Sequence, residues 1–130
     1  MKRWIAWSTA ALLPLVIAAL AAAPAGLAKR GDVRVAGTCT GSTTSKLKLS
    51  PENGRIEVEF EVDQNRNGVR WKVALSRNGR VVARLAKVTR PPSGSFEARI
   101  VAPDGPGVDA FRTRATSPSG EVCTARASLA

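Results

Sequence analysis

The chain has 130 residues, with 20 Lys or Arg against 10 Asp or Glu, and it contains no histidine. The lack of histidine excludes Ser-His-Asp and Cys-His catalytic systems and ordinary zinc sites. The formal net charge of +10 fits a surface that attracts polyanions and fits a merely soluble basic surface equally well.

Residues 1–28 predict a secretory signal helix. Lys2 and Arg3 precede a long run without charged residues, and small residues close that run. Cleavage is expected after Ala28, and Ala25 is the alternative site. The uncharged run is also long enough to span a bilayer, so an uncleaved membrane anchor is the rival interpretation. We therefore expect a secreted or cell-envelope protein that meets a membrane only through this N-terminal segment.

The remaining residues, 29–130, have the length of one domain. Without the signal, 18 basic residues face 10 acidic ones, which gives a mature net charge of +8. Cys39 and Cys123 lie near the two ends of this domain, and an exported protein normally pairs such cysteines. Closing so long a loop contributes about 4–5 kcal/mol in the chain-entropy model. Two free buried thiols are the alternative.

Apolar residues recur with period two throughout the domain, and no segment shows a helical apolar stripe. Asn78-Gly79 predicts a two-residue hairpin turn. The cysteines fall on the first and last expected strands, so the disulfide should join terminal strands and not form a central bridge between sheets. These features predict an all-β, immunoglobulin-like antiparallel β-sandwich of seven to eight strands. The expected strands cover residues 33–39, 45–50, 55–63, 69–75, 80–88, 95–101, 109–117 and 121–129.

The stretch "DQNRNG" resembles the start of an EF-hand calcium loop, with Asp63, Asn65 and Asn67 as candidate ligands. The position that needs a bidentate Glu is occupied by Ala74. We therefore expect a plain loop between two paired strands, and neither a metal nor another cofactor. A calcium-stabilised extracellular module that uses the Asp63–Gly68 loop is kept as an alternative.

Pairing the strands on either side of this loop would match charges across them. It would place Phe60 opposite Trp71, Glu61 opposite Arg70, and Glu59 opposite Lys72. The run Glu57, Glu59 and Glu61 could suggest the paired carboxylates of a glycosidase. We expect a solvated strand face on which nothing raises one pKa over another, so we predict no enzyme.

Positive charge is the feature left without an explanation. The aromatic residues Phe60, Trp71, Phe96 and Phe111 are expected in the core, which leaves no platform for nucleic-acid bases. We expect anionic envelope polymer, or a protein, as the partner. The basic residues without an evident acidic partner are Arg34, Lys46, Lys48, Arg55, Arg77, Arg80, Arg84, Arg99, Arg112, Arg114 and Arg126. The predicted polyanion contacts among them are Arg34, Lys46, Lys48, Arg84, Arg112 and Arg114.

Four segments, residues 65–73, 78–82, 92–100 and 119–127, resemble the small secreted β-sandwich proteins of actinobacteria. The segment "ATSPSGE" is similar to the last hairpin of bacterial immunoglobulin-like modules. The resemblance implies a secreted sandwich and brings no activity with it. We therefore expect a non-catalytic secreted or cell-envelope module that binds through a basic surface. A membrane-anchored structural protein is the further alternative.

Overall fold

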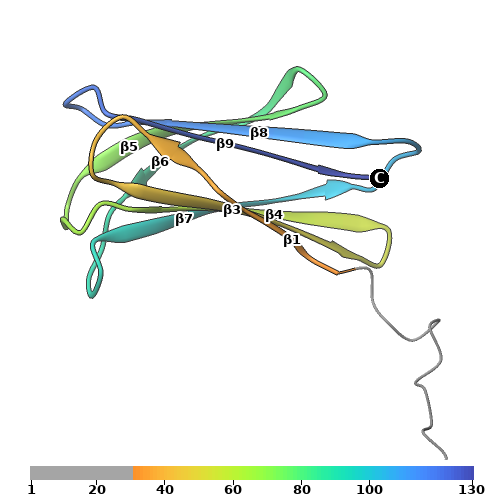
Figure 1. Ribbon diagram of the computed structural model, residues 1–130, viewed down its shortest axis with the longest axis horizontal. Coiled ribbons are helices and arrows are strands. Elements are labelled where there is room, and N and C mark those ends of the chain that lie inside the picture. Colours follow the sequence, from red (N-terminus) through yellow and green to blue (C-terminus); the bar gives the residue numbers. More distant parts are fainter. Residues whose placement is uncertain (1–30) are drawn as a thin grey trace, which may run out of the picture.

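The structure is a computed structural model that describes residues 31–130. The predicted signal segment, with its alternative cleavage sites, lies outside these residues. Nine strands form two antiparallel sheets that stack face to face as a β-sandwich (Figure 1). The all-β prediction is thereby confirmed. No helix in the described part of the chain is long and apolar enough for a membrane span.

The two sheets differ in size. Sheet A contains, in spatial order, β1 (Val33–Ala36), β3 (Thr44–Glu52), β4 (Arg55–Asp63) and β7 (Ser95–Pro103). Sheet B contains, in spatial order, β2 (Thr38–Cys39), β9 (Val122–Leu129), β8 (Asp109–Thr116), β5 (Arg70–Arg77) and β6 (Arg80–Val88).

The core lies between the sheets and is built from the alternating apolar positions. On β4 every second residue is fully buried, and Trp71 on β5 contacts Phe96 on β7 with ring centroids 6.2 Å apart. Burying side chains of this size contributes roughly 1.5–3 kcal/mol each. The largest fully buried apolar side chains are Trp71, Phe60, Phe111, Leu47, Leu49, Ile56, Leu75, Val58 and Val62.

The predicted first strand, 33–39, is two strands in two sheets. Its first half pairs with β3 in sheet A, and its second half pairs with β9 in sheet B. The chain passes from sheet A to sheet B at Gly37, where an added Cβ would collide with the Ser45 side chain and the Thr124 carbonyl. This residue without a side chain lets the backbone pass between the layers. The split raises the count to nine strands, above the predicted seven to eight.

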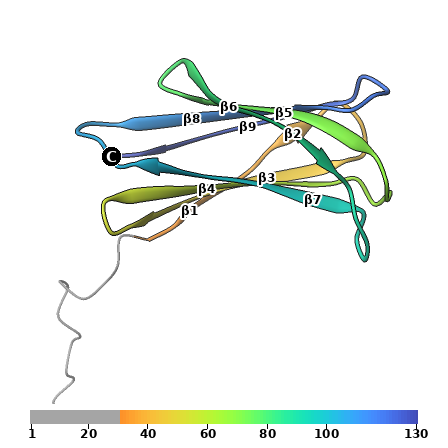
Figure 2. The same ribbon diagram turned by 180° about the vertical axis from the view of Figure 1, so that it is seen from behind.

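The predicted pairing across the DQNRNG loop is wrong. β4 pairs with β3 and β7, whereas β5 pairs with β6 and β8, so β4 and β5 belong to different sheets (Figure 2). Phe60 therefore lies beside Leu47 and Ala98 and not beside Trp71. Alternation identifies the buried face of a strand but not its neighbour. The loop is long enough to cross the roughly 10 Å between stacked sheets.

The two other local predictions are confirmed. Asn78 and Gly79 both have positive φ, 48° and 82°, and they form the turn between β5 and β6. Cys39 and Cys123 form a disulfide and are directly paired residues of β2 and β9. The bond lies within sheet B and closes a separation of 84 residues. It joins the terminal strands, as predicted, and does not bridge the two layers.

Candidate functional site

The outer face of sheet B carries cations from four neighbouring strands. Residues directly paired in an antiparallel sheet point to the same side, so the register shows which residues share a face. Ala74 on β5 pairs with Arg84 on one side and Arg114 on the other, which puts all three in one row. The exposed cations of this face, which we call the basic face, are Arg70, Lys72, Arg84, Arg112, Arg114 and Arg126.

The row around Ala74 forms a shallow depression of about 350 Å³. Its floor is the small Ala74 side chain, and Lys72, Arg84, Arg114 and Thr116 stand around it. Large side chains around a small one leave a hollow. An anionic group in this hollow could contact three cations and one hydroxyl donor.

No acidic side chain occupies the outward positions of sheet B within residues 31–130, and none of its six cations has an ion pair there. Arg112 on β8 is directly paired with Arg126 on β9. Like charges directly opposite each other in a sheet destabilise it. An anion bound to this face would relieve the repulsion between these cations.

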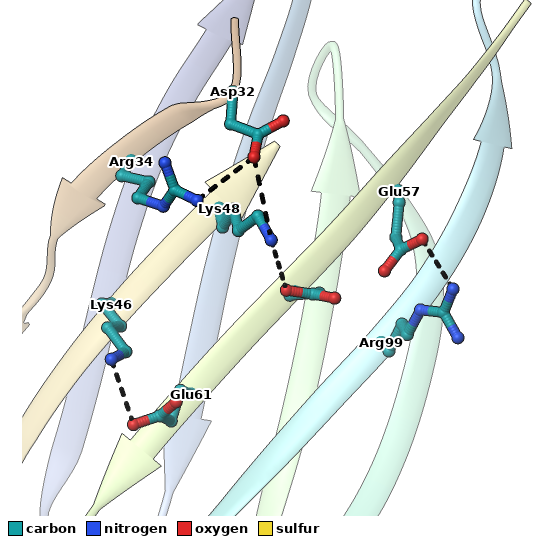
Figure 3. A network of polar contacts seen from close by, with 8 residues as sticks. Asp32, Arg34, Lys46, Lys48, Glu57, Glu61 and Arg99 are labelled. Atoms are coloured by element: carbon teal, nitrogen blue, oxygen red, sulfur yellow. Dashed lines mark hydrogen bonds and ion pairs between the residues drawn. The ribbon is translucent and has the colours of Figure 1, made fainter. Parts of the chain in front are cut away.

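The outer face of sheet A shows the contrast, because most of its cations lie in ion pairs (Figure 3). Lys46 lies 3.5 Å from Glu61, and Lys48 lies 3.5 Å from Glu59 and 3.8 Å from Asp32. On the same face the Arg34 guanidinium donates to Asp32 at 3.2 Å, and Arg99 donates to Glu57 at 2.6 Å. Four outward cations of this sheet, Arg34, Lys46, Lys48 and Arg99, therefore have carboxylate partners.

The six predicted polyanion contacts are divided between the two faces. Arg84, Arg112 and Arg114 lie together on the basic face. Arg34, Lys46 and Lys48 lie on sheet A in ion pairs, so their predicted lack of acidic partners is wrong. The same correction applies to Arg99 and to Arg77, which pairs with Asp109 at the end of the sandwich.

Three residues of the basic face were not among the predicted contacts. The sequence predicts that Arg70 and Lys72 pair with glutamates across the DQNRNG loop, a pairing that the structure does not contain. Arg126 is among the residues predicted to lack an acidic partner, but it is not among the predicted polyanion contacts. Because β8 and β9 form a hairpin, their alternation places Arg126 on the same outward face as Arg112 and Arg114. This alternation is the sequence signal that identifies Arg126.

Glu57 and Glu59 do not behave alike, contrary to the prediction. The hydrogen bond from Arg99 is the main cause that lowers the pKa of Glu57 to about 2. The neighbouring Glu57 carboxylate, followed by partial burial, raises the pKa of Glu59. The two side chains line different depressions on sheet A.

Two side chains of the DQNRNG loop, those of Asp63 and Gln64, accept hydrogen bonds within the protein. Asp63 Oδ1 accepts a hydrogen bond from the Asn65 backbone amide at 3.1 Å, and Gln64 accepts one from the Trp71 indole at 3.1 Å. Gly94 lies so close that an added Cβ would collide with the backbone of Asn65 and Arg66. These contacts fix the crossing between the sheets, while the calcium alternative for Asp63, Asn65 and Asn67 stays a prediction.

A comparison with protein families finds no match, and a search of curated proteins finds none either. The resemblance to secreted actinobacterial sandwiches therefore stays a prediction, and function has to be argued from the site itself.

Proposed function

We propose that this protein is a non-catalytic extracytoplasmic module that binds anionic envelope polymer through the basic face. The observation that carries the proposal is the separation of charge: one outer face holds most of its cations in ion pairs, and the other presents exposed cations without outward carboxylates. Cations that have no internal partners are available to polyanions. The hollow over Ala74 adds a place where several of them converge.

The disulfide hints at an oxidising, extracytoplasmic setting, where polymers of the envelope are within reach. The aromatic side chains Phe60, Trp71, Phe96 and Phe111 are all buried. Stacking on exposed aromatic rings contributes much of the affinity for unpaired bases. This burial favours a polymer that is recognised by charge over a single-stranded nucleic acid.

We further infer an immunoglobulin-like topology. In this assignment β3, β4 and β7 correspond to strands A, B and E of an immunoglobulin domain. The strands β9, β8, β5 and β6 then correspond to G, F, C and C′. Trp71 is buried on β5, the position of the conserved tryptophan on strand C. The disulfide departs from this pattern because it joins β2 and β9 within one sheet.

The test compares two variants that lose the same charge from opposite faces. The first carries Lys72→Gln, Arg84→Gln, Arg112→Gln and Arg114→Gln on the basic face. The control carries Arg34→Gln, Lys46→Gln, Lys48→Gln and Arg99→Gln on sheet A. Each protein is applied to a phosphate-bearing resin at low salt and eluted with a salt gradient.

We expect the native protein and the control variant to be retained, and the basic-face variant to elute early. Each lost phosphate contact should lower the slope of log affinity against log salt by about 0.7–0.9, so four substitutions remove about 3. Equal elution of the two variants would show that total charge decides retention and would refute the proposal. So would failure of the folded native protein to bind at low salt.

A further inference from the structure

Five cations of the basic face form a line that crosses the sheet obliquely. Arg70 and Lys72 follow each other on the outer side of β5, and Arg114 and Arg112 follow each other on β8. The register places Arg114 beside Ala74 and Arg112 beside Ser76, so the β8 pair is displaced along the sheet relative to the β5 pair. Arg126 on β9 continues the line beside Arg112. We call Arg70, Lys72, Arg114, Arg112 and Arg126 the diagonal stripe.

The spacing along the stripe follows from sheet geometry. Alternate residues of a strand are about 7 Å apart, and neighbouring strands are about 4.8 Å apart. The successive steps between backbone positions are therefore about 7, 8, 7 and 5 Å. The path along all five positions is roughly 27 Å. The stripe is a line of single charges at nearly regular intervals, not a compact cluster.

A chain of single bonds advances about 1.2 Å per bond when extended, as the polypeptide itself does. A step of about 7 Å thus corresponds to about six backbone bonds between successive charges. A phosphodiester polymer in which a three-carbon polyol joins the phosphates has six bonds per repeat. Inorganic polyphosphate has two bonds per repeat, so most of its charges would fall between the cations.

We propose that the ligand of the basic face is an extended polyol phosphodiester that lies along the diagonal stripe with one phosphate at each cation. The proposal rests on the proposed function and adds the chemical class of the polymer. The phosphate at Arg114 lies over the hollow, where Lys72 and Arg84 also reach it. Each of the other phosphates meets one principal cation.

The first experiment measures affinity against ligand length by calorimetry at low salt. The probes are oligomers of 1,3-linked glycerol phosphate with two to eight phosphates. Each added phosphate should raise affinity about fivefold until five are present, because one cation near an anionic surface contributes about that factor. Oligomers with more than five phosphates should gain affinity only through the larger number of ways in which five of their phosphates can be placed on the stripe. A plateau already at two or three phosphates would overturn the linear arrangement.

The second experiment moves one charge without changing the total. The variant Arg114→Ala/Ala86→Arg removes the middle of the stripe and places the charge on β6, at another exposed outward position. Affinity for the five-phosphate oligomer should fall at least about fivefold. Affinity for inorganic polyphosphate with five phosphates should stay within about twofold, because total charge dominates that contact. An unchanged melting temperature establishes that the variant is folded.

Three further results would count against the inference in different ways. If relocation leaves both affinities unchanged, the stripe has no role, while binding by the basic face stands. If relocation weakens both polymers equally, charge spacing is not recognised, and the polymer class is wrong. If the native protein binds neither polymer at low salt, the proposed function itself is refuted.

Discussion

The ion pair between Arg77 and Asp109 should be the most stability-sensitive polar contact in the described part of the chain. Arg77 Nε and Nη2 both donate to Asp109 Oδ1, at 2.9 and 2.6 Å. The Asp109 side chain is only 4% exposed, and its Oδ2 atom has no hydrogen-bond partner. The Arg77 guanidinium also lies 5.7 Å from the centroid of the Phe111 ring. Removing Arg77 would leave a buried carboxylate without a cation.

The variant Arg77→Met should therefore lose about 3–5 kcal/mol of unfolding free energy, the usual effect of breaking a buried pair from one side. Replacing both partners, as Arg77→Met/Asp109→Leu, should recover most of that loss, because a hydrophobic pair avoids the desolvation of two charges. The matched control is Arg99→Met. It breaks the more exposed pair with Glu57, which water screens, and should leave the unfolding midpoint close to that of the native protein.

Urea unfolding followed by Trp71 fluorescence measures these differences in protein that retains its disulfide. With a slope of about 1–1.5 kcal/mol per molar urea for a domain of this size, the Arg77→Met midpoint should fall by about 2 M or more. An Arg77→Met midpoint equal to that of Arg99→Met would refute the reasoning. So would a double variant no more stable than the single one, because the buried charge would then not be the source of the loss.

Three other predictions follow from single contacts. Replacing Cys39 and Cys123 by Ala should lower the unfolding free energy by about 4–5 kcal/mol in urea melts, and an unchanged midpoint would contradict the loop-closure argument. Gly94→Ala should cost more than about 1 kcal/mol in the same melts, because its φ of 68° and the adjacent backbone both exclude a Cβ. Glu57 has a folded pKa of about 2 against its usual 4.5, so its contribution to stability is present above pH 4.5 and is lost as the pH falls toward 2. In an NMR titration Arg99→Gln should raise this pKa toward 4.5, and an unchanged value would exclude the ion pair as its cause.

The sequence identified most of the strands and their buried faces because a period of two determines both. On β4 the alternation of Ile56, Val58, Phe60 and Val62 with acidic residues leaves one arrangement that buries apolar surface. Local turn chemistry was equally decisive at Asn78-Gly79, because few residues other than Asn and Gly adopt positive φ there. Each of these features is settled within about ten residues of chain.

The local sequence of a strand does not determine which strands it pairs with. The wrong predictions concern these pairing partners. Two alternating strands joined by six residues can pair as a hairpin or enter opposite sheets, and their alternation is the same in both cases. The choice depends on contacts with residues far away in sequence, such as the backbone N–H of Gln64, which donates to the backbone carbonyl of Gly94 at 3.1 Å. The split of the first strand at Gly37 likewise depends on how close Ser45 and Thr124 come.

The same crossing explains the candidate site. Had β4 paired with β5 as a hairpin, Glu61 would stand beside Arg70 and Glu59 beside Lys72, and two of the five cations of the diagonal stripe would be neutralised within the protein. Because residues 64–69 instead carry the chain to the other sheet, the β4 glutamates lie beside Lys46, Lys48 and Arg99. The cations of β5 are left with β8 and β6, which present no outward carboxylate. The acidic strand and the basic face are thus separated by one loop. Composition sets how many cations lack a carboxylate partner, and topology decides that they gather on the outer face of sheet B.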